Sequence, residues 1–318
     1  MSRRIGCIQI VMGPAGSGKT TYCQAMQQHF PTARIANLDP AAEDDSLPYE
    51  PSVDVRELIS VPEVMEELQL GPNGALLYCM EYLLEHLEDW LRDELDALED
   101  EEGYLILDCP GQIELYTHVP IMRQILDRMQ QWGYGPSMVA VFCIDSAFCI
   151  DASKFLSGTL LSLSAMVALE LPHVTILTKC DLMDEREVER ILEYGSAQAI
   201  WDREQDRQTL LRRTDWNYNL DDVVVVVDPE PNATTVSPEE KERIQLLEDR
   251  RLKRERLTQS ISQVLDDWQM VSFVPLNIRD EESLDHVFSL VNHAVQYGED
   301  LEVKEPPHDF DDDDDGPM

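Results

Sequence analysis

A glycine-rich octapeptide near the N-terminus constrains the fold more than any other part of the sequence. It has the pattern G-x-x-x-x-G-K-T and stands between the apolar run at 5–12 and a helical pattern. Glycines allow backbone N–H groups to surround phosphate oxygens, while a lysine adds positive charge and a hydroxyl can ligate Mg²⁺. The alternative is a glycine-rich helix start without a ligand, which the strand-loop-helix context disfavours. We therefore predict a phosphate loop that binds nucleotide through Gly13, Pro14, Ala15, Gly16, Ser17, Gly18, Lys19, Thr20 and Thr21.

Short apolar runs alternate with helical patterns along most of the chain. The runs cover residues 5–12, 34–38, 104–107, 138–144, 174–177 and 271–276. Such alternation is typical of a parallel sheet covered by helices. The fold prediction is therefore α/β, a P-loop NTPase with a mostly parallel sheet flanked by helices. Ligands bind at the carboxyl ends of such strands, so the residues after each run are the candidates for chemistry.

Two polar regions do not fit this core. Residues 194–257 are charge-dense, and we interpret them as a charged helical insertion within a single domain spanning residues 1–298. Residues 299–318 are strongly acidic and contain five consecutive aspartates at 311–315. A run of like charge is typical of a disordered tail.

The charge balance restricts the partners. The chain has 25 Lys and Arg against 63 Asp and Glu, a formal net charge of −38. Nucleic acids and anionic membranes would be repelled by most of the surface. No apolar stretch reaches the roughly 18 to 20 residues of a spanning helix. We therefore expect no direct nucleic-acid partner and no membrane partner.

A second motif follows the run at 104–107. Asp108 can bind Mg²⁺ directly or through water, and the N–H of Gly111 can contact a γ-phosphate. Gln112 occupies the position at which a GTPase orients its attacking water, an amide that a kinase would not need. Glu114 is a candidate to hold Gln112 or the water, with an exposed helix carboxylate as the alternative. For the motif as a whole, the alternative is a polar turn without a ligand.

A third motif, T-K-x-D, directly follows the run at 174–177 and begins with Thr178 and Lys179. A carboxylate at Asp181 can accept hydrogen bonds from N1–H and the 2-amino group of guanine, whereas adenine offers an acceptor at N1. The stem of Lys179 would cover the base. Asn277, after another apolar run, is a candidate for the guanine side of the pocket or equally for a strand-end turn. Together the three motifs predict guanine-nucleotide binding.

Three segments resemble the GPN-loop GTPase family. They are residues 37–42, the Gly-Pro-Asn tripeptide at 71–73 and residues 108–118. Without its neighbours, 71–73 would be read only as a turn. Stretches at 79–82, 154–158 and 296–302 are most similar to the third eukaryotic paralogue of the family. Gly71 and Pro72 predict a tight, stiff loop that presents Asn73, and residues 54–70 before it have a helix-like pattern.

The resemblance implies a dimeric, Mg²⁺-dependent GTPase that binds GTP. In that family the loop of one subunit reaches the nucleotide of its partner, so Asn73 is implied to stabilise phosphate in trans. Asp39 is implied to lie near Mg²⁺ or the catalytic water, which gives Thr20, Asp39 and Asp108 as metal ligands. The implied catalytic residues are Gln112, Asn73, Asp39 and Glu114.

The resemblance also implies partners and a location. The expected partner is the first GPN-loop paralogue, in a heterodimer, or a second copy in a homodimer. The implied role is assembly and nuclear import of RNA polymerase II, whose subunits would be the clients. We expect a cytoplasmic protein with shuttling to the nucleus.

Two other functions remain open from the sequence. A phosphoryl-transfer kinase of the same fold would need a lid rich in arginine, and arginines are few outside the insertion. A scaffold could bind GTP and assemble clients with little turnover. Arg56 is a candidate arginine finger, for which a surface arginine is the favoured alternative.

Overall fold

The computed structural model describes residues 5–43, 47–98, 103–150, 152–183 and 271–297, with isolated residues at 186, 188 and between 246 and 263. The predicted acidic tail lies outside the described residues, and so does the predicted insertion apart from a few isolated positions. One isolated residue beyond the insertion, Ile261, packs against the hydrophobic core.

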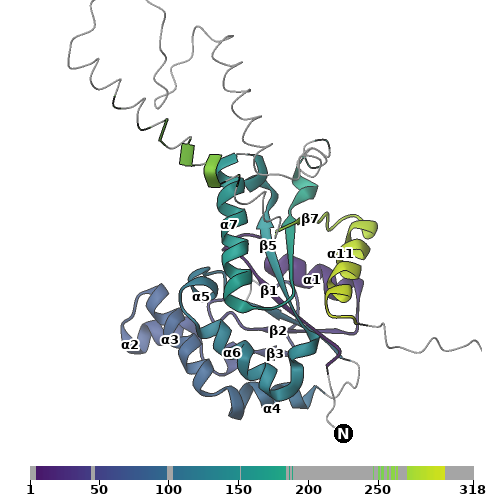
Figure 1. The fold of residues 1–318 in the computed structure, drawn as a ribbon. Helices are drawn as coiled ribbons and strands as arrows, with labels where there is room; N and C mark the ends of the chain where they lie inside the picture. The colour runs from purple at the N-terminus through teal and green to yellow at the C-terminus, as the bar shows by residue number, and fades with distance from the viewer. Residues whose placement is uncertain are drawn as a thin grey trace, which may run out of the picture.

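A seven-stranded parallel sheet forms the centre of the fold, in the order β3-β2-β4-β1-β5-β6-β7 (Figure 1). The strands are β1 (Cys7–Met12), β2 (Ala33–Asn37), β3 (Val53–Asp54), β4 (Tyr104–Asp108), β5 (Met138–Asp145), β6 (His173–Thr178) and β7 (Phe273–Pro275). All six predicted apolar runs are strands, which confirms the α/β prediction. The short strand β3 was not predicted, because two residues are too few to give a pattern.

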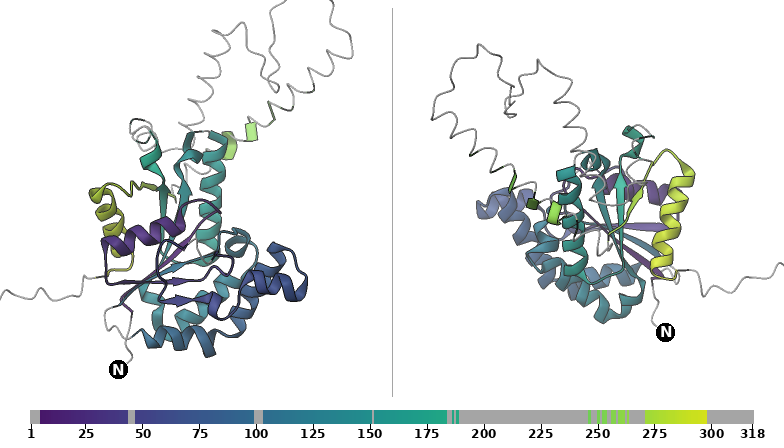
Figure 2. Two further views of the ribbon diagram at one scale, coloured as in Figure 1. Left: turned by 180° about the vertical axis from the view of Figure 1, so that it is seen from behind. Right: turned by 45° about the horizontal axis from the view of Figure 1, so that its top comes forward.

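Helices cover both faces of the sheet (Figure 2). One face packs against α1 (Lys19–His29) and α11 (Glu281–Ala294), which are joined by a contact of 2.9 Å between His29 Nε2 and Asp285 Oδ1. The other face packs against α2 (Val61–Leu68), α3 (Pro72–Glu85), α4 (Arg92–Ala97), α5 (Glu114–Thr117), α6 (Ile121–Met129) and α7 (Ala152–Leu169). Shorter helical turns are η1 (Val55–Glu57), η2 (Leu87–Leu91), η3 (Gln130–Tyr134), η4 (Gly135–Ser137), η5 (Ser146–Ile150) and η6 (Cys180–Leu182).

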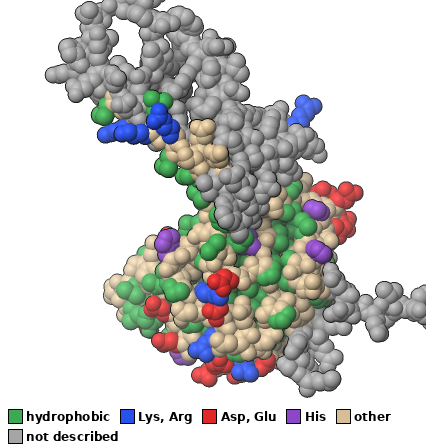
Figure 3. Space-filling model, in the orientation of Figure 1, with side chains coloured by type: hydrophobic (Ala, Val, Ile, Leu, Met, Phe, Trp, Pro, Cys, Tyr) green, Lys and Arg blue, Asp and Glu red, His purple; other side chains and the backbone are tan. Residues whose placement is uncertain are grey.

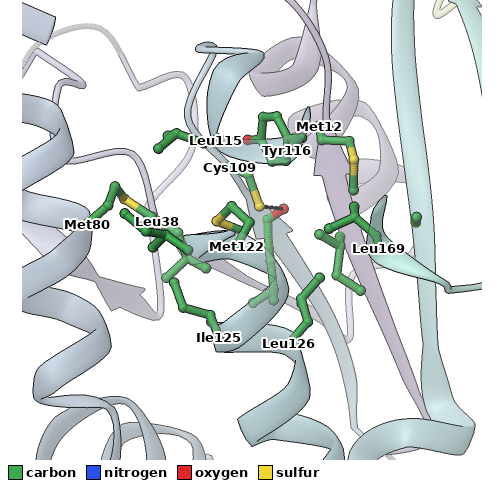
Figure 4. Packing of buried hydrophobic residues seen from close by; sticks show 14 of the residues in the cluster. Met12, Leu38, Met80, Cys109, Leu115, Tyr116, Met122, Ile125, Leu126 and Leu169 are labelled. Carbon is green, nitrogen blue, oxygen red and sulfur yellow. Dashed lines mark hydrogen bonds between the residues drawn. The ribbon is translucent and has the colours of Figure 1, made fainter. Parts of the chain in front are cut away.

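Burial on both faces explains why the central strands read as continuous apolar runs. Successive side chains of a strand point to opposite faces, so Ile8 and Ile10 enter the core on the α3 side while Cys7 and Val11 face α1. On the α3 side, Cys109 lies among Met80, Leu115 and Met122 (Figure 4). The packed core on the α3 side therefore fixes the position of the loop after β4.

The Gly-Pro-Asn tripeptide differs from the predicted loop. Gly71 is the N-cap of α3, and Pro72 is the first residue of that helix. Proline suits this position because its fixed φ matches the helix and its missing N–H has no helical acceptor there. Asn73 therefore lies in the first turn of a helix, while α2 accounts for the helical pattern predicted just before it.

The surface and the core agree with the composition. On the face shown in Figure 3, acidic side chains gather at the lower edge. Within the described parts of the chain, no helix combines the length and the hydrophobicity needed to cross a bilayer. Six cysteines with described side chains form no disulfide and are buried, namely Cys7, Cys23, Cys79, Cys109, Cys143 and Cys180.

Candidate nucleotide-binding site

The strand order brings the predicted motifs together at one edge of the sheet. The phosphate loop follows β1, the central strand, and Val11 pairs with Asp108 of the neighbouring β4. Asn37 of β2 pairs with Asp108 from the other side, and Asp39 follows two residues later. On the opposite side of β1, Asp145 of β5 pairs with Thr178 of β6. Candidate metal and catalytic residues therefore lie on one side of the phosphate loop, and candidate base-binding residues lie on the other.

The phosphate loop has backbone conformations that favour glycine, and one position where a side chain would clash. Gly13 has a φ of 145°, and a Cβ there would clash with the carbonyl oxygen of Cys143. Gly16 and Gly18 also have positive φ values, of 74° and 85°. Any side chain at position 13 would push the loop away from the end of β5. The sequence folds this way because the glycines stand where the chain turns between β1 and α1.

The interior of the loop contains polar groups that fit phosphate. Lys19 is 8% exposed, and its Nζ donates to the carbonyl oxygen of Pro14 at 3.2 Å. The buried Ser17 Oγ has no hydrogen-bond partner within the described residues. A buried hydroxyl without a partner is costly unless a ligand supplies one. A Cβ on Gly111 would lie 3.2 Å from Lys19 Nζ. The segment that follows Asp108 therefore lies directly beside the lysine of the phosphate loop.

Two acids, the buried Asp108 and the half-buried Asp39, lie beside the loop on its β4 side. Asp108 accepts a hydrogen bond from Tyr49 at 2.7 Å and another from the side chain of Thr20. Burial raises the pKa of the Asp108 carboxyl, against the opposing effects of those hydrogen bonds and of Lys19. Burial also raises the pKa of Asp39, although the N–H of Ala41 donates to it at 3.0 Å. The negative charge of Asp39 raises the pKa of Asp108 further, so the two carboxyls are close enough to repel.

This arrangement fits a bound magnesium ion. Mg²⁺ prefers oxygen ligands and is usually held by one or two carboxylates together with substrate phosphates and water. Thr20, Asp39 and Asp108 supply a hydroxyl and two carboxylates around the phosphate loop. Two desolvated carboxyls that repel each other would both be stabilised by a divalent cation.

The candidate catalytic amide is paired within the chain. Gln112 Nε2 donates to Asn73 Oδ1 at 3.0 Å, which joins the loop after β4 to the first turn of α3. Asn73 is exposed and Gln112 is half-buried. Glu114 is exposed in the first turn of α5, and its role beside Gln112 stays a prediction.

A buried tyrosine fixes the loop that carries Gln112. The hydroxyl of Tyr116 donates to the carbonyl oxygen of Pro110, two residues before Gln112. Tyr116 is 2% exposed and packs with Cys109 in the core on the α3 side (Figure 4). The position of Gly111 and Gln112 is therefore set by packing as well as by the strand.

The base-recognition motif is tied to the phosphate loop by two hydrogen bonds. Thr178 Oγ1 donates to the carbonyl oxygen of Ser17 at 2.6 Å, and Lys179 Nζ donates to that of Gly16 at 2.7 Å. Lys179 Nζ also forms an ion pair with Asp145 at 2.7 Å. The backbone of Lys179 is left-handed, with a φ of 60°, which is unfavourable for a residue with a side chain and is maintained here by its two side-chain partners, the Gly16 carbonyl and Asp145.

The carboxylate of Asp181 has a positively charged neighbour, Arg279. The side chain of Asp181 is 10% exposed, and Arg279 Nε lies 3.4 Å from Oδ2. Arg279 is 74% exposed, so water can replace it at low cost. Asn277 Oδ1 accepts a hydrogen bond from the N–H of Arg279 at 3.0 Å, which is the strand-end turn considered as the alternative for Asn277. The structure places Asn277 beside the base motif but assigns its side chain to that turn.

Sequence reasoning missed Tyr49 and left the role of Arg56 open. Tyr49 carries no motif, and nothing in the sequence places it against Asp108. Arg56 is neither a free surface residue nor directed at the phosphate loop, because its guanidinium binds both oxygens of Asp54 at 2.6 to 3.0 Å. Asn37 Nδ2 also donates to Asp54, at 2.9 Å. The pairing of β2 with β3 places Asn37 opposite Asp54.

Comparison with known proteins decides the family. The sequence profile described as "Conserved hypothetical ATP binding protein" matches residues 11–297. A protein named "GPN-loop GTPase 3" from Dictyostelium discoideum is 44% identical over 308 residues, which are 94% of this chain and 90% of the relative. Proteins of the same name are 40% identical in Danio rerio, over 94% of this chain and 90% of theirs, and 38% identical in Saccharomyces cerevisiae, over 95% and 96%.

The chain belongs to the GPN-loop GTPase family. This confirms the resemblance inferred from the motifs, including its similarity to the third paralogue. A solved structure supports the fold: a GTPase in apo form from Pyrococcus abyssi aligns with a TM-score of 0.62 at 22% identity, covering 92% of this chain and 98% of that one. The profile description names ATP, whereas the GPN-loop relatives are named for GTP. Asp181 is the residue of this chain that bears on the difference, because its carboxylate complements guanine and not adenine.

Proposed function

We propose that this GPN-loop family member is a Mg²⁺-dependent GTPase that acts as a dimeric switch. The observation that carries the proposal is the attachment of the T-K-x-D segment to the phosphate loop, through Thr178 and Lys179. It fixes a guanine-complementary carboxylate, Asp181, at a set distance from a phosphate-binding loop. The names of the relatives support the same activity.

The residues of this chain have separable roles in that reaction. Backbone N–H groups of residues 13–20 and the Nζ of Lys19 hold the phosphates, and the hydroxyl of Ser17 gains a partner there. Gly111 offers its N–H to the γ-phosphate, and Gln112 orients the attacking water. Tyr116 holds the carbonyl of Pro110 so that both residues stay in place. Charge that develops on the γ-phosphate is stabilised by Lys19 and by preorganised N–H groups.

Magnesium fits the oxygen ligands of Thr20, Asp39 and Asp108, and when bound it would neutralise charge on the β- and γ-phosphates. The chain contributes the orientation of those ligands. Thr20 and Tyr49 both donate to Asp108, which limits the directions that the carboxylate can take.

The dimer and the cellular role are part of the proposal and rest on the family resemblance. Asn73 is exposed at the start of α3, where a second subunit could receive it. In the single chain it is bonded to Gln112, so action in trans requires that hydrogen bond to open. We propose the first GPN-loop paralogue or a second copy as the partner. We also propose RNA polymerase II subunits as clients during assembly and nuclear import, with a cytoplasmic location and shuttling.

One observation favours a second candidate, a GTP-binding scaffold with little turnover. The Nε2 group of Gln112, the amide expected to orient the water, already donates to Asn73 within the chain. An isolated subunit with this pairing would bind GTP but hydrolyse it slowly until a partner withdraws Asn73.

Single-turnover hydrolysis of GTP by the full-length chain tests the proposal. The reaction is run with Mg²⁺ or EDTA, with ATP in place of GTP, and with or without the first paralogue. We expect hydrolysis that requires Mg²⁺, prefers GTP and is faster with the partner, and that is abolished in Lys19→Ala. Tight GTP binding with no turnover under any condition would leave the scaffold, whereas equal use of ATP and GTP would contradict guanine specificity.

A further inference from the structure

The hydroxyl of Tyr49 makes a direct hydrogen bond to one of the candidate magnesium ligands. It donates to Asp108 Oδ2 at 2.7 Å. Tyr49 is 8% exposed and Asp108 is 2% exposed, so water does not compete for this bond. The two residues are 59 positions apart in sequence and belong to different parts of the sheet edge.

The backbone on both sides of Tyr49 is fastened to the sheet. Gln24 Nε2 of α1 donates to the carbonyl oxygen of Pro48 at 2.8 Å. The N–H of Ser52 donates to the carbonyl oxygen of Ile35 in β2 at 2.7 Å. The ring of Tyr49 packs in the core on the α1 side, with Leu47 against the same cluster. The hydroxyl is therefore held in place by the fold.

This bond restricts how Asp108 can present its carboxylate. The Tyr49 hydroxyl engages Oδ2, and the Thr20 side chain hydrogen-bonds to the same carboxylate. A carboxylate with two fixed donors is limited to one orientation, with its remaining lone pairs available to a cation. Groups of this kind, which orient a ligand without touching the metal, commonly control metal affinity.

We propose that Tyr49 is a positioning residue that sets the Mg²⁺ affinity of the nucleotide site through Asp108. The proposal rests on the proposed function, in that Mg²⁺ and nucleotide bind together at this edge of the sheet. It adds a determinant that lies outside the sequence motifs of the site. It also connects the chain between β2 and β3 to occupancy of the metal site.

Tyr22 provides a matched control. Like Tyr49 it is a buried tyrosine in the core on the α1 side, at 1% exposed, and it makes one side-chain hydrogen bond, to Gln9 at 2.8 Å. Its acceptor is a neutral amide beneath the sheet edge and not a candidate ligand. Tyr22→Phe and Tyr49→Phe therefore remove the same hydroxyl from similar surroundings, and only the second changes the environment of Asp108.

The test measures release of N-methylanthraniloyl-GDP from the full-length chain as Mg²⁺ is titrated from an EDTA-buffered start. For Tyr49→Phe we expect the Mg²⁺ concentration that half-maximally slows release to rise about tenfold, the lower end of effects seen when such supporting groups are removed. The release rate in EDTA should not change, because the phosphate and base contacts are intact. Tyr22→Phe should leave the Mg²⁺ requirement unchanged. The Mg²⁺ requirement of single-turnover GTP hydrolysis should shift in parallel.

Gln24→Ala tests the same positioning of Tyr49 without altering the core. It frees the Pro48 carbonyl and should raise the Mg²⁺ requirement in the same direction by a smaller factor, which keeps the proposal testable if Tyr49→Phe does not fold. An equal Mg²⁺ requirement in Tyr49→Phe, Tyr22→Phe and the unmodified chain would overturn the role of Tyr49 alone. A release rate that ignores Mg²⁺ in the unmodified chain would instead remove the metal from the proposed function.

Discussion

Gln112 and Asn73 of one chain are joined by a hydrogen bond, from Nε2 to Oδ1 over 3.0 Å. The donor lies in the loop after β4 and the acceptor in the first turn of α3, so the bond connects the two motifs that the family resemblance names as catalytic. Each amide has one further hydrogen-bonding group, the oxygen of Gln112 and the nitrogen of Asn73. The pair can therefore act together on a water and a phosphate, or separate when a partner subunit takes Asn73.

Gln112→Leu should slow single-turnover hydrolysis of GTP by at least roughly tenfold, about 1.4 kcal/mol of barrier. The affinity for GTP should stay nearly the same, because the hydrogen bond that the described residues give the Gln112 side chain goes to Asn73 and not to the phosphate loop or the base motif. A quench-flow measurement at saturating enzyme gives the rate, and fluorescence titration gives the affinity. An unchanged rate would remove Gln112 from the mechanism.

Mixing Asn73→Ala with Gln112→Leu distinguishes action in trans from action in cis. A mixed dimer would contain one complete site if Asn73 serves the neighbouring nucleotide, so we expect partial recovery of turnover over either variant alone. Light scattering confirms that dimers form, and the first paralogue replaces one chain if they do not. Turnover per site should also rise with protein concentration until dimers saturate. No recovery in confirmed dimers, with a rate independent of concentration, would place Asn73 with its own Gln112 as in the single chain.

Asp181→Asn should lose GTP affinity and gain affinity for xanthosine triphosphate, because an amide can donate to the carbonyl that xanthine offers. Competition binding with the two nucleotides measures the exchange. Arg279→Gln is a useful companion, since it removes the exposed cation at 3.4 Å and should leave the preference for guanine in place. Equal binding of ATP and GTP by the unmodified chain would contradict the role of Asp181.

The burial of His173 predicts that the free energy of unfolding depends on pH in the acidic range. Burial lowers the pKa of His173 from 6.5 to about 4, and its Nδ1 is buried without a partner among the described residues. The unfolded chain therefore binds a proton that the folded chain resists, and the stabilisation from neutral His173 is complete above 6.5 and lost as the pH falls towards 4.

Relative to His173→Gln, which does not titrate, the unfolding free energy of the unmodified chain should fall by about 3 kcal/mol across that range. Urea unfolding of both proteins at pH steps from neutral to acid measures the difference, and other titrating groups cancel between them. Parallel pH curves would show that His173 titrates normally in the folded chain.

The sheet could be predicted from sequence, because strands buried on both faces leave continuous apolar runs, as in β4 and β5. The clustering of the motifs at one edge could also be predicted, because parallel strands all have their carboxyl ends at that edge. Strand β3 could not be predicted, because Val53 and Asp54 are too few residues to show a pattern. The helical start at Pro72 had a signal, proline at the first helical position, which the prediction of a loop set aside.

The contacts of the site were less accessible to sequence reasoning. Motifs identify residues that touch a ligand but not the residues that orient them, so Tyr49 and Tyr116 were missed. The position of Arg279 beside Asp181 depends on how the turn after β7 folds, which a single sequence does not specify. The predicted insertion, the tail and the domain boundaries stay predictions.

The two bonds from Thr178 and Lys179 to the carbonyls of Ser17 and Gly16 have a consequence for the ligand. The span between the carboxylate at one end and the phosphate loop at the other is set by the protein before any nucleotide arrives. A molecule with guanine but a longer or shorter connection to its phosphates cannot reach both ends. Guanosine, which has no phosphate, would reach only the carboxylate end. The same bonds mean that loosening the base segment also loosens the phosphate loop, so selectivity for guanine and affinity for phosphate are gained or lost together.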